Sequence, residues 1–96
     1  MLEVRQTDTY SSWFAGLRDR AAKLRINIRI RRLSLGNAGD VRPVGAGVSE
    51  LRVNFGPGYR VYFVTKGQSL VILLAGGDKS SQADDIDRAK TLARNL

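Results

Sequence analysis

A predicted β-hairpin spanning residues 47–63 constrains the fold of this chain more than any other segment. A strand alternates its side chains between two faces, and opposed residues of an antiparallel pair share a face. With a three-residue Gly-Pro-Gly loop at 56–58, Phe55 lies opposite Tyr59, and the large apolar side chains of both strands share one face. A register shifted by one residue would mix polar and apolar side chains, which a half-buried sheet resists.

The other face of this hairpin is polar and basic. Its predicted opposed pairs are Asn54 with Arg60, Arg52 with Tyr62, and Glu50 with Val64, whereas the apolar face carries Leu51, Val53, Phe55, Tyr59, Val61 and Phe63. A polar sheet face is either an ordinary solvated surface or a binding surface, and the hairpin alone does not distinguish the two. We expect the two arginines and Tyr62 to be presented together on that surface.

The composition excludes several classes of chemistry. The chain has no Cys and no His, so it cannot form disulfides, a thiolate- or His-ligated zinc site, or a Ser-His-Asp triad. We predict neither a metal ion nor a cofactor. Sixteen basic residues against nine acidic ones give a formal charge of +7, which favours nucleic acid or an acidic protein as the partner.

The length and hydrophobic pattern predict one domain, residues 1–96, with a single core. No apolar run approaches the roughly 18 residues of a membrane span, and the N-terminus has no basic region followed by an apolar core. We expect no transmembrane segment, no secretory signal and no membrane partner. The lack of Cys fits a reducing compartment, so we expect a cytoplasmic protein.

The remaining segments predict an α+β domain. We expect a strand over 2–5, a helix capped by Thr7 or Asp8, a helix over 21–35, the hairpin, an interior strand over 70–74, and a final helix that begins at Ser80 or Ser81. The polar, glycine-rich segment 36–45 is predicted to be a surface loop. The expected order is β-α-α-β-β-β-α, with an N-terminal helical hairpin and a C-terminal helix packed on an antiparallel sheet.

Residues 21–35 fit two structures. Their isoleucines and Leu24 alternate with polar residues, as in a strand. On a helix the segment forms two apolar stripes, one of Ala22, Ile26, Ile30 and Leu33 and the other of Ala21, Leu24, Ile28 and Leu35. The length, the absence of internal Gly or Pro, and the Gly36-Asn37 that follows favour the helix. A helix lying between the sheet and a second helix would bury both stripes.

Four side chains form the predicted active site: Arg52, Arg60, Tyr62 and Lys79. Arginine matches the oxygens of a phosphate with a rigid charged fork, and lysine adds a point charge. Such a cluster can hold an RNA backbone and stabilise charge on a phosphorane-like transition state. Tyr62 is assigned either to stacking on a base or to proton transfer, the latter if neighbouring cations lower its pKa.

RNA cleavage requires neither a metal ion nor a water nucleophile, because the 2′-hydroxyl of the RNA can attack the adjacent phosphate. The absence of His is therefore compatible with a ribonuclease. The residues predicted to bind the surrounding RNA are Arg42, Asn54 and Lys66.

The acidic residues support simpler interpretations. Glu50 lies on the same face as Arg52 and is expected to neutralise it in a surface ion pair that contributes little stability. Asp78 is assigned to a helix start. Asp84 and Asp85 are assigned to the dipole of the final helix rather than to a metal site.

Four segments of the sequence occur in an order typical of one family. They are Gly36-Asn37-x-Gly39-Asp40, Gly45-x-Gly47-Val48-x-Glu50-Leu51-Arg52, Gly56-Pro57-Gly58-Tyr59-Arg60-Val61-Tyr62-Phe63 and Leu73-Leu74-x-Gly76-Gly77-Asp78-Lys79-Ser80-x-Gln82. Together they resemble the RelE/ParE toxin superfamily, in its HigB-like branch of phage-related addiction module killer proteins. The resemblance extends from Trp13 to the last helix.

This resemblance implies the fold expected above and the toxin half of a type II toxin–antitoxin pair. Many relatives cleave messenger RNA in the ribosomal A site without a metal ion, using basic residues and often a Tyr or His. By position, Arg52 and Arg60 match the sheet arginines of the family, and Lys79 matches the lysine of its Gly-Gly-Asp-Lys segment. Tyr62 is a weaker match. The implied partners are messenger RNA, the ribosome and a helix-turn-helix antitoxin, with operator DNA contacted only through the antitoxin complex.

Two other functions are compatible with the sequence. The same scaffold serves ParE-type inhibitors of gyrase, which act without enzymatic chemistry. The third interpretation is a module that acts mainly by binding its antitoxin and contributing to repression of their shared operon.

Overall fold

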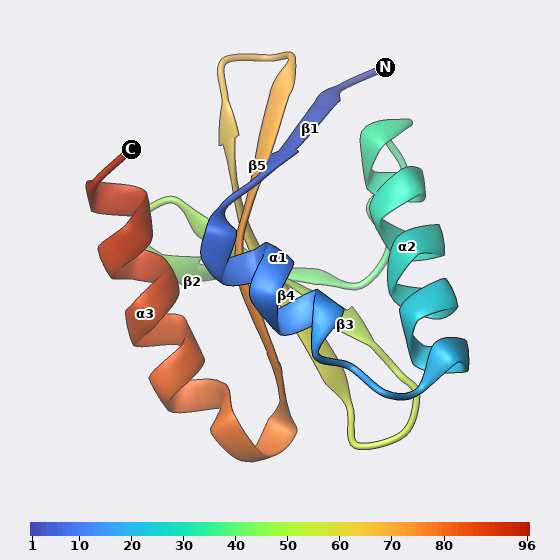
Figure 1. Ribbon diagram of the computed structural model, residues 1–96. Coiled ribbons are helices and arrows are strands. Elements are labelled where there is room, and N and C mark those ends of the chain that lie inside the picture. Colours follow the sequence, from blue (N-terminus) through green and yellow to red (C-terminus); the bar gives the residue numbers. More distant parts are fainter.

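The computed structural model describes all 96 residues and contains five strands, three α-helices and one short 3₁₀ helix (Figure 1). In chain order they are β1 (Glu3–Gln6), α1 (Asp8–Ala15), α2 (Arg20–Ser34), β2 (Val41–Gly45), β3 (Val48–Val53), β4 (Tyr59–Lys66), β5 (Leu70–Asp78), η1 (Lys79–Ser81) and α3 (Gln82–Arg94). None of these helices has the length and apolar character that crossing a membrane would require.

The five strands form one mixed sheet in the order β1-β5-β4-β3-β2. β1 runs parallel to β5, whereas the other neighbouring strands are antiparallel. The predicted α+β class is confirmed. The prediction of a wholly antiparallel sheet is wrong, because the long connection between β1 and β5 lets β5 return in the same direction as β1. β5 is an interior strand, as its apolar run predicts, and it continues through Gly76 and Gly77 to Asp78.

One strand, β2, lies in the segment 36–45 that we predicted to be a surface loop. It pairs with β3 at the edge of the sheet, with an irregularity between Pro43 and Gly45. Proline is tolerated on an edge strand because one side of such a strand has no ladder partner. The glycine and proline content that indicates a loop is therefore equally compatible with a short edge strand.

Helices cover both faces of the sheet (Figure 1). α1 and α2 contribute Tyr10, Ile26 and Leu33 to a core on one face. α3 contributes Ala89 to a second core, which includes Tyr62 of β4. The polar face of the hairpin is therefore the face on which α3 packs.

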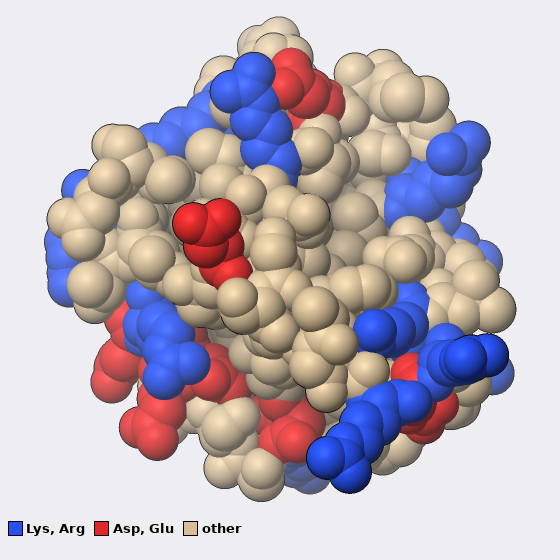
Figure 2. All heavy atoms as spheres, viewed as in Figure 1, with Lys and Arg blue, Asp and Glu red and all other residues tan.

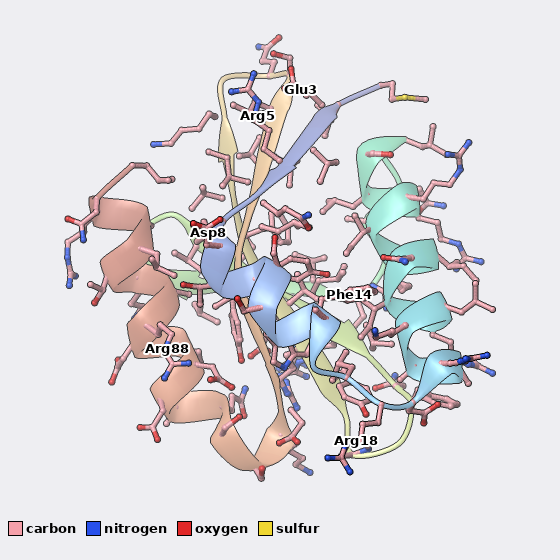
Figure 3. All side chains as sticks on the ribbon, viewed as in Figure 1. Glu3, Arg5, Asp8, Phe14, Arg18 and Arg88 are labelled. Atoms are coloured by element: carbon pink, nitrogen blue, oxygen red, sulfur yellow. The ribbon has the colours of Figure 1, made fainter.

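Thr7 fixes the start of α1, as predicted. Its hydroxyl accepts a hydrogen bond from the main-chain N–H of Tyr10 at 3.1 Å and donates one to the carbonyl of Leu74 at 2.6 Å. The first contact caps the helix, and the second attaches the helix to β5. Tyr10 is buried beside Trp13 and Phe14, which confirms that the apolar side of α1 packs on the sheet. Figure 3 shows Phe14 between α1 and α2.

The segment 21–35 is helical, as predicted, and Asp19 caps α2 by accepting hydrogen bonds from two main-chain N–H groups. The buried residues of one apolar stripe are Ala22, Ile26 and Leu33. The expectation that the second stripe is also buried is wrong, because no second helix covers it. Leu24, Ile28 and Leu35 are exposed on the outer side.

The hairpin of β3 and β4 has the predicted faces but a different register. Arg52 lies opposite Arg60 rather than opposite Tyr62, and the loop is residues 54–58 rather than three residues. Gly56 and Gly58 in the loop both have positive φ, and Pro57 between them has no N–H group to donate to the opposite strand. Strand pairing therefore ends at Val53 and Tyr59. The error is a displacement of two residues, which preserves the face of every side chain.

Gly76 and Gly77, near the end of β5, have no room for a side chain. A Cβ on Gly76 would lie 2.2 Å from the Trp13 ring, and one on Gly77 would lie 1.8 Å from the Asp85 carboxylate. Relieving such overlap costs about 1–3 kcal/mol or more. Gly76→Ala and Gly77→Ala should lower the free energy of unfolding in urea. Gly16→Ala, whose nearest neighbour would be 3.4 Å away, should leave it nearly unchanged. Wild-type stability in both β5 variants would contradict this packing.

Candidate functional site

The polar face of the hairpin holds a cluster of side chains centred on Glu50. Strand pairing places Arg42, Glu50 and Tyr62 in one row across β2, β3 and β4. Arg52 and Arg60 form the adjacent row, nearer the hairpin loop. Because opposed residues share a face, these five side chains lie on the same side of the sheet.

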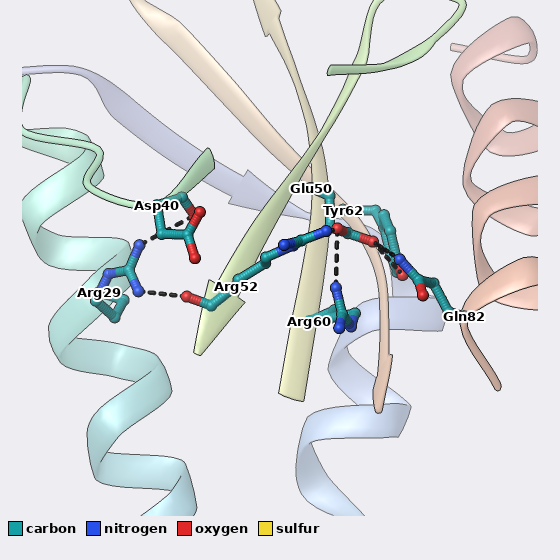
Figure 4. Close-up of polar contacts among 7 residues, drawn as sticks. All are labelled: Arg29, Asp40, Glu50, Arg52, Arg60, Tyr62 and Gln82. Atoms are coloured by element: carbon teal, nitrogen blue, oxygen red, sulfur yellow. Dashed lines mark hydrogen bonds and ion pairs between the residues drawn. The ribbon is translucent and has the colours of Figure 1, made fainter. Parts of the chain in front are cut away.

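Glu50 accepts four hydrogen bonds, two on each carboxylate oxygen (Figure 4). Oε1 accepts from Arg52 Nε and from Arg60 Nη1, both at 3.0 Å. Oε2 accepts from the Tyr62 hydroxyl at 3.0 Å and from Gln82 Nε2 at 2.9 Å. Since Glu50 is only 1% exposed, its carboxylate is bound almost entirely by side chains of this protein.

This arrangement corrects the interpretation of Glu50 as one half of a surface ion pair. Burial by itself would raise the pKa of the Glu50 carboxyl. Hydrogen bonds from Arg52, Gln82 and Tyr62, together with the charge of Arg60, outweigh burial and lower that pKa. The carboxylate therefore stays ionised near neutral pH, where it holds two guanidinium groups in place.

Tyr62 is buried rather than presented on the surface as predicted. Its ring belongs to the core beneath α3, and its hydroxyl donates to Glu50. Burial raises the pKa of the Tyr62 phenol, the Glu50 charge and hydrogen bond raise it further, and Arg60 opposes them only weakly. The lowered pKa that proton transfer by Tyr62 requires is therefore not present, and the buried ring cannot stack on a base.

Arg60 connects the buried cluster to the surface. It is 9% exposed, and its Nε–H is buried without a hydrogen-bond partner. Its side chain lines a hollow of about 410 Å³, together with Lys79 and the hairpin loop 54–58. The positive charge of the Arg60 guanidinium, which lines this hollow beside Lys79, favours an anion there.

Lys79 contributes a second positive charge to the hollow. It is exposed at the start of η1 and forms no salt bridge within the chain. The neighbouring Asp78 accepts hydrogen bonds from the main-chain N–H and the hydroxyl of Ser80, which lower the Asp78 pKa. Asp78 thus caps η1, as its assignment to a helix start predicts, and forms no salt bridge with Lys79.

Arg29 of α2 fixes the end of β3. Its guanidinium donates to the main-chain carbonyls of Arg52 and, at 3.3 Å, of Asp40 (Figure 4). It also donates to the main-chain carbonyl of Ala38 at 3.0 Å. The Arg52 side chain is 27% exposed, so it is the more accessible of the two arginines that share Glu50.

The residues predicted to bind RNA are distributed unevenly. Asn54 is exposed in the hairpin loop and lines the hollow. Arg42 is exposed on β2, opposite Glu50. Lys66 lies at the other end of β4, about 20 Å from the Arg60 position at the rise of an extended strand. The fold therefore brings Asn54 and Arg42 to the cluster and leaves Lys66 away from it.

Two residues are absent from the predicted site: Gln82, which binds the Glu50 carboxylate, and Arg29, which binds the main chain of Arg52. In the sequence, Gln82 is only the last residue of the segment that begins Gly76-Gly77-Asp78-Lys79. Its hydrogen bond to Glu50 depends on the packing of α3 against the sheet, which the sequence does not show. Arg29 is one of several arginines on α2, and the sequence does not indicate which of them binds the main chain and which are solvated.

The fold and this cluster define a small α+β protein in which Arg60 joins a buried carboxylate to a hollow that it lines with Lys79. The chain belongs to the family described as Phage derived protein Gp49-like (DUF891), whose model matches residues 13–95. This is a family of addiction-module killer proteins, which is consistent with the predicted toxin class and implies an antitoxin partner.

Two similar proteins extend this comparison. An uncharacterized protein of Haemophilus influenzae is 48% identical over 95 residues, which cover 99% of this chain and 96% of that protein. The solution structure of the conserved hypothetical protein HP0894 from Helicobacter pylori is similar with a TM-score of 0.53 at 17% identity. The match covers 83% of this chain and 97% of HP0894, and it supports the fold alone.

Proposed function

We propose that this chain is the toxin of a type II toxin–antitoxin pair, in the HigB-like branch of the RelE/ParE superfamily. It inhibits translation by cleaving messenger RNA on the ribosome, and a helix-turn-helix antitoxin neutralises it. The observation that carries the proposal is the hollow that two basic side chains, Arg60 and Lys79, line together. Membership of a family of addiction-module killer proteins supports the toxin assignment. The formal charge of +7 supports a polyanionic substrate.

In the proposed reaction the scissile phosphate occupies the hollow. The 2′-oxygen of the preceding nucleotide attacks phosphorus, and the bond from phosphorus to the 5′-oxygen breaks. One product ends in a 2′,3′-cyclic phosphate and the other begins with a 5′-hydroxyl. The 2′-hydroxyl loses its proton to solvent, and the 5′-oxygen gains one from solvent. Because the nucleophile belongs to the RNA, the cleavage step itself needs no metal-bound water.

The proposed role of the protein is electrostatic. Arg52 and Arg60 share the Glu50 carboxylate, and Lys79 adds a further positive charge at the hollow. Arg60 and Lys79 line the hollow that the phosphate would occupy, and a charged group held in place before the reaction stabilises the developing charge most effectively. The proposed catalytic residues are Arg52, Arg60 and Lys79, with Asn54 and Arg42 binding the adjacent RNA.

Glu50, Tyr62 and Gln82 are proposed positioning residues. Glu50 restricts the rotamers of both arginines, which reduces the freedom that they lose when a phosphate binds. Tyr62 and Gln82 fix the second oxygen of the same carboxylate. Tyr62 is thus proposed to act through Glu50, in place of the proton transfer or base stacking assigned to it from the sequence.

Expression in growing bacteria followed by mapping of transcript ends tests this function. We expect growth arrest, with new 5′ ends that fall within translated reading frames. A copy of one cleaved transcript that lacks its start codon is the matched control, and it should stay intact because it is not translated. Intact messenger RNA during growth arrest would contradict the proposal. Altered DNA supercoiling in those cells would favour a ParE-type gyrase inhibitor instead.

A further inference from the structure

A second hollow, the β1 hollow, lies on the face of the sheet opposite the Glu50 cluster. It has a volume of about 380 Å³, which falls within the range of small-molecule sites. Three elements form most of its lining: β1 through Val4 and Gln6, α1 through Tyr10 and Phe14, and α2 through Asn27 and Ile30. Its apolar members belong to the core that α1 and α2 form with the sheet, which places the hollow on that face.

The main chain of β1 presents hydrogen-bonding groups to the β1 hollow. In a parallel pair, alternate residues of a strand bond to the neighbouring strand, and the residues between them point outward. The N–H groups of Glu3 and Thr7 bond to carbonyls in and next to β5, whereas the N–H of Leu2 bonds to α2. Val4 and Gln6 follow the same alternation as Leu2. Their main-chain groups therefore point away from β5, toward the hollow that both residues line.

The carbonyl of Val4 and the N–H of Gln6 are neighbours on this open edge. In a parallel ladder, such a pair bonds to the N–H and the carbonyl of a single residue on an adjacent strand. A small ligand makes the same two hydrogen bonds when a donor and an acceptor lie side by side on one planar edge. The N–H and C=O groups of a lactam have this arrangement.

Apolar walls from α1 and α2 flank this edge. The rings of Tyr10 and Phe14 are inclined by 20°, with their centres 6.1 Å apart. Lys23 Nζ lies 5.3 Å from the centre of the Phe14 ring, so Phe14, which lies between α1 and α2, is held by contacts from both helices (Figure 3). Ile30 forms the wall on α2. A planar aromatic ligand can pack against walls of this kind.

The β1 hollow is uncharged although the chain carries a formal charge of +7. Arg5 is the only charged residue that lines it. Side chains alternate along a strand and Val4 packs on the core of α1 and α2, so the Arg5 side chain points to the other face, where it pairs with Glu3. Figure 2 shows the surface between α1 and α2 in tan, with Lys and Arg toward the outer edge of α2. A neutral hollow favours an uncharged group over a phosphate.

We propose that the β1 hollow binds the base of a purine nucleoside that has a lactam edge, as hypoxanthine and guanine do. The N1–H of the base donates to the carbonyl of Val4, and O6 accepts from the N–H of Gln6. The ring packs against Phe14 and Ile30, and a purine buries more apolar surface there than a pyrimidine. The ribose stays at the open mouth, beside the amide of Asn27. Because this site and the Glu50 cluster lie on opposite faces of the sheet, it does not depend on the proposed function.

Titration of the ¹⁵N-labelled protein with inosine, followed by amide chemical shifts, tests this site. We expect saturable shift changes at the N–H groups of Gln6, Phe14 and Ile30. The matched ligand is 1-methylinosine, in which a methyl group replaces the N1 proton. It should bind about tenfold or more weakly, because it loses one hydrogen bond and leaves the carbonyl of Val4 without that donor.

Gln6→Pro and Gln6→Ala separate the main chain of β1 from its side chain. Both substitutions remove the side-chain amide, but only proline removes the N–H that faces the hollow. The strand pairing should survive, because this N–H does not bond to β5 and proline is tolerated at such edge positions. Gln6→Pro should bind inosine about tenfold more weakly than Gln6→Ala does.

Asn27→Trp tests the hollow without a change to the core, because Asn27 is exposed at the mouth. The indole should occlude the site and abolish saturable binding of inosine. Asn37→Trp is the matched control, since Asn37 is exposed and lies outside the hollow, and it should bind as the wild type does. Circular dichroism verifies folding, and Asn27→Trp decides the question if Gln6→Pro does not fold.

Three results would overturn the proposal. The first is the absence of saturable shift changes with inosine. The second is equal affinity for inosine and 1-methylinosine, or wild-type affinity in a folded Asn27→Trp variant. The third is a set of shift changes confined to the surroundings of Arg60 and Lys79, which would place the nucleoside in the candidate active site instead.

Discussion

Glu50→Ala should destabilise this protein strongly, by about 3–5 kcal/mol in the free energy of unfolding. The substitution leaves Arg60, which is 9% exposed, with a buried charge and no counterion. It also leaves the buried Tyr62 hydroxyl without its acceptor. An unpaired buried charge and an unsatisfied buried donor both raise the free energy of the folded state. Water solvates the same groups in the unfolded chain, so the unfolded state is not destabilised. Urea denaturation followed by circular dichroism measures the effect.

Glu3→Ala is the matched control for this change. Glu3 pairs with Arg5 on β1 at 2.5 Å, with side chains that are 58% and 66% exposed (Figure 3). An ion pair in water contributes little, so its loss should change the free energy of unfolding by less than about 1 kcal/mol. Equal effects of Glu3→Ala and Glu50→Ala would show that Glu50 is not the buried centre of the cluster.

The same cluster predicts a pH dependence of stability. The pKa of Glu50 in the folded protein lies below its ordinary value of 4.5, so the unfolded chain binds the proton more tightly than the folded one. The stability that the Glu50 charge contributes is therefore fully present above about pH 4.5 and is lost as the pH falls through the folded-state pKa. The difference in free energy of unfolding between the wild type and Glu50→Gln should shrink over that range.

The sequence predicts which side chains share a face of the hairpin but not how deeply they are buried. Shared faces follow from the two-residue period of a strand, which is a local property. Burial of Glu50 and Tyr62 depends on α3, whose Gln82 contacts Glu50 across 32 positions of the chain. A polar residue that is satisfied by distant partners cannot be separated from a solvated one by local pattern alone.

Similar reasoning explains the other errors. The predicted register assumes a three-residue loop, whereas the observed loop is residues 54–58. Which loop forms depends on which residue pair is the last to hydrogen-bond before the turn. Both loops keep the same faces, so the apolar pattern does not discriminate between them. On α2, the two apolar stripes are correct, but only the presence or absence of a covering element decides that Leu24 and Ile28 remain exposed.

Arg60→Gln should abolish toxicity while the chain remains folded. The amide can still donate to Glu50, but the substitution removes the positive charge of Arg60 from the hollow. Loss of one donor to a developing anionic charge lowers a catalytic rate by about 10²–10³-fold. We expect that reduction in messenger RNA cleavage by the purified protein in a translation reaction, alongside restored growth in cells that express the variant.

Lys66→Gln is the matched control, because it removes the same charge at the other end of β4 and should leave cleavage unchanged. Urea denaturation separates catalysis from folding. Wild-type cleavage by a folded Arg60→Gln variant would remove Arg60 from the site, and an unfolded variant would show that this arginine is structural.

If Arg60→Gln does not fold, Lys79→Gln still tests the hollow, because Lys79 is exposed and forms no salt bridge. Its substitution should lower cleavage about tenfold or more without a change in stability. Unchanged cleavage in the Lys79→Gln variant would place the phosphate elsewhere on the protein.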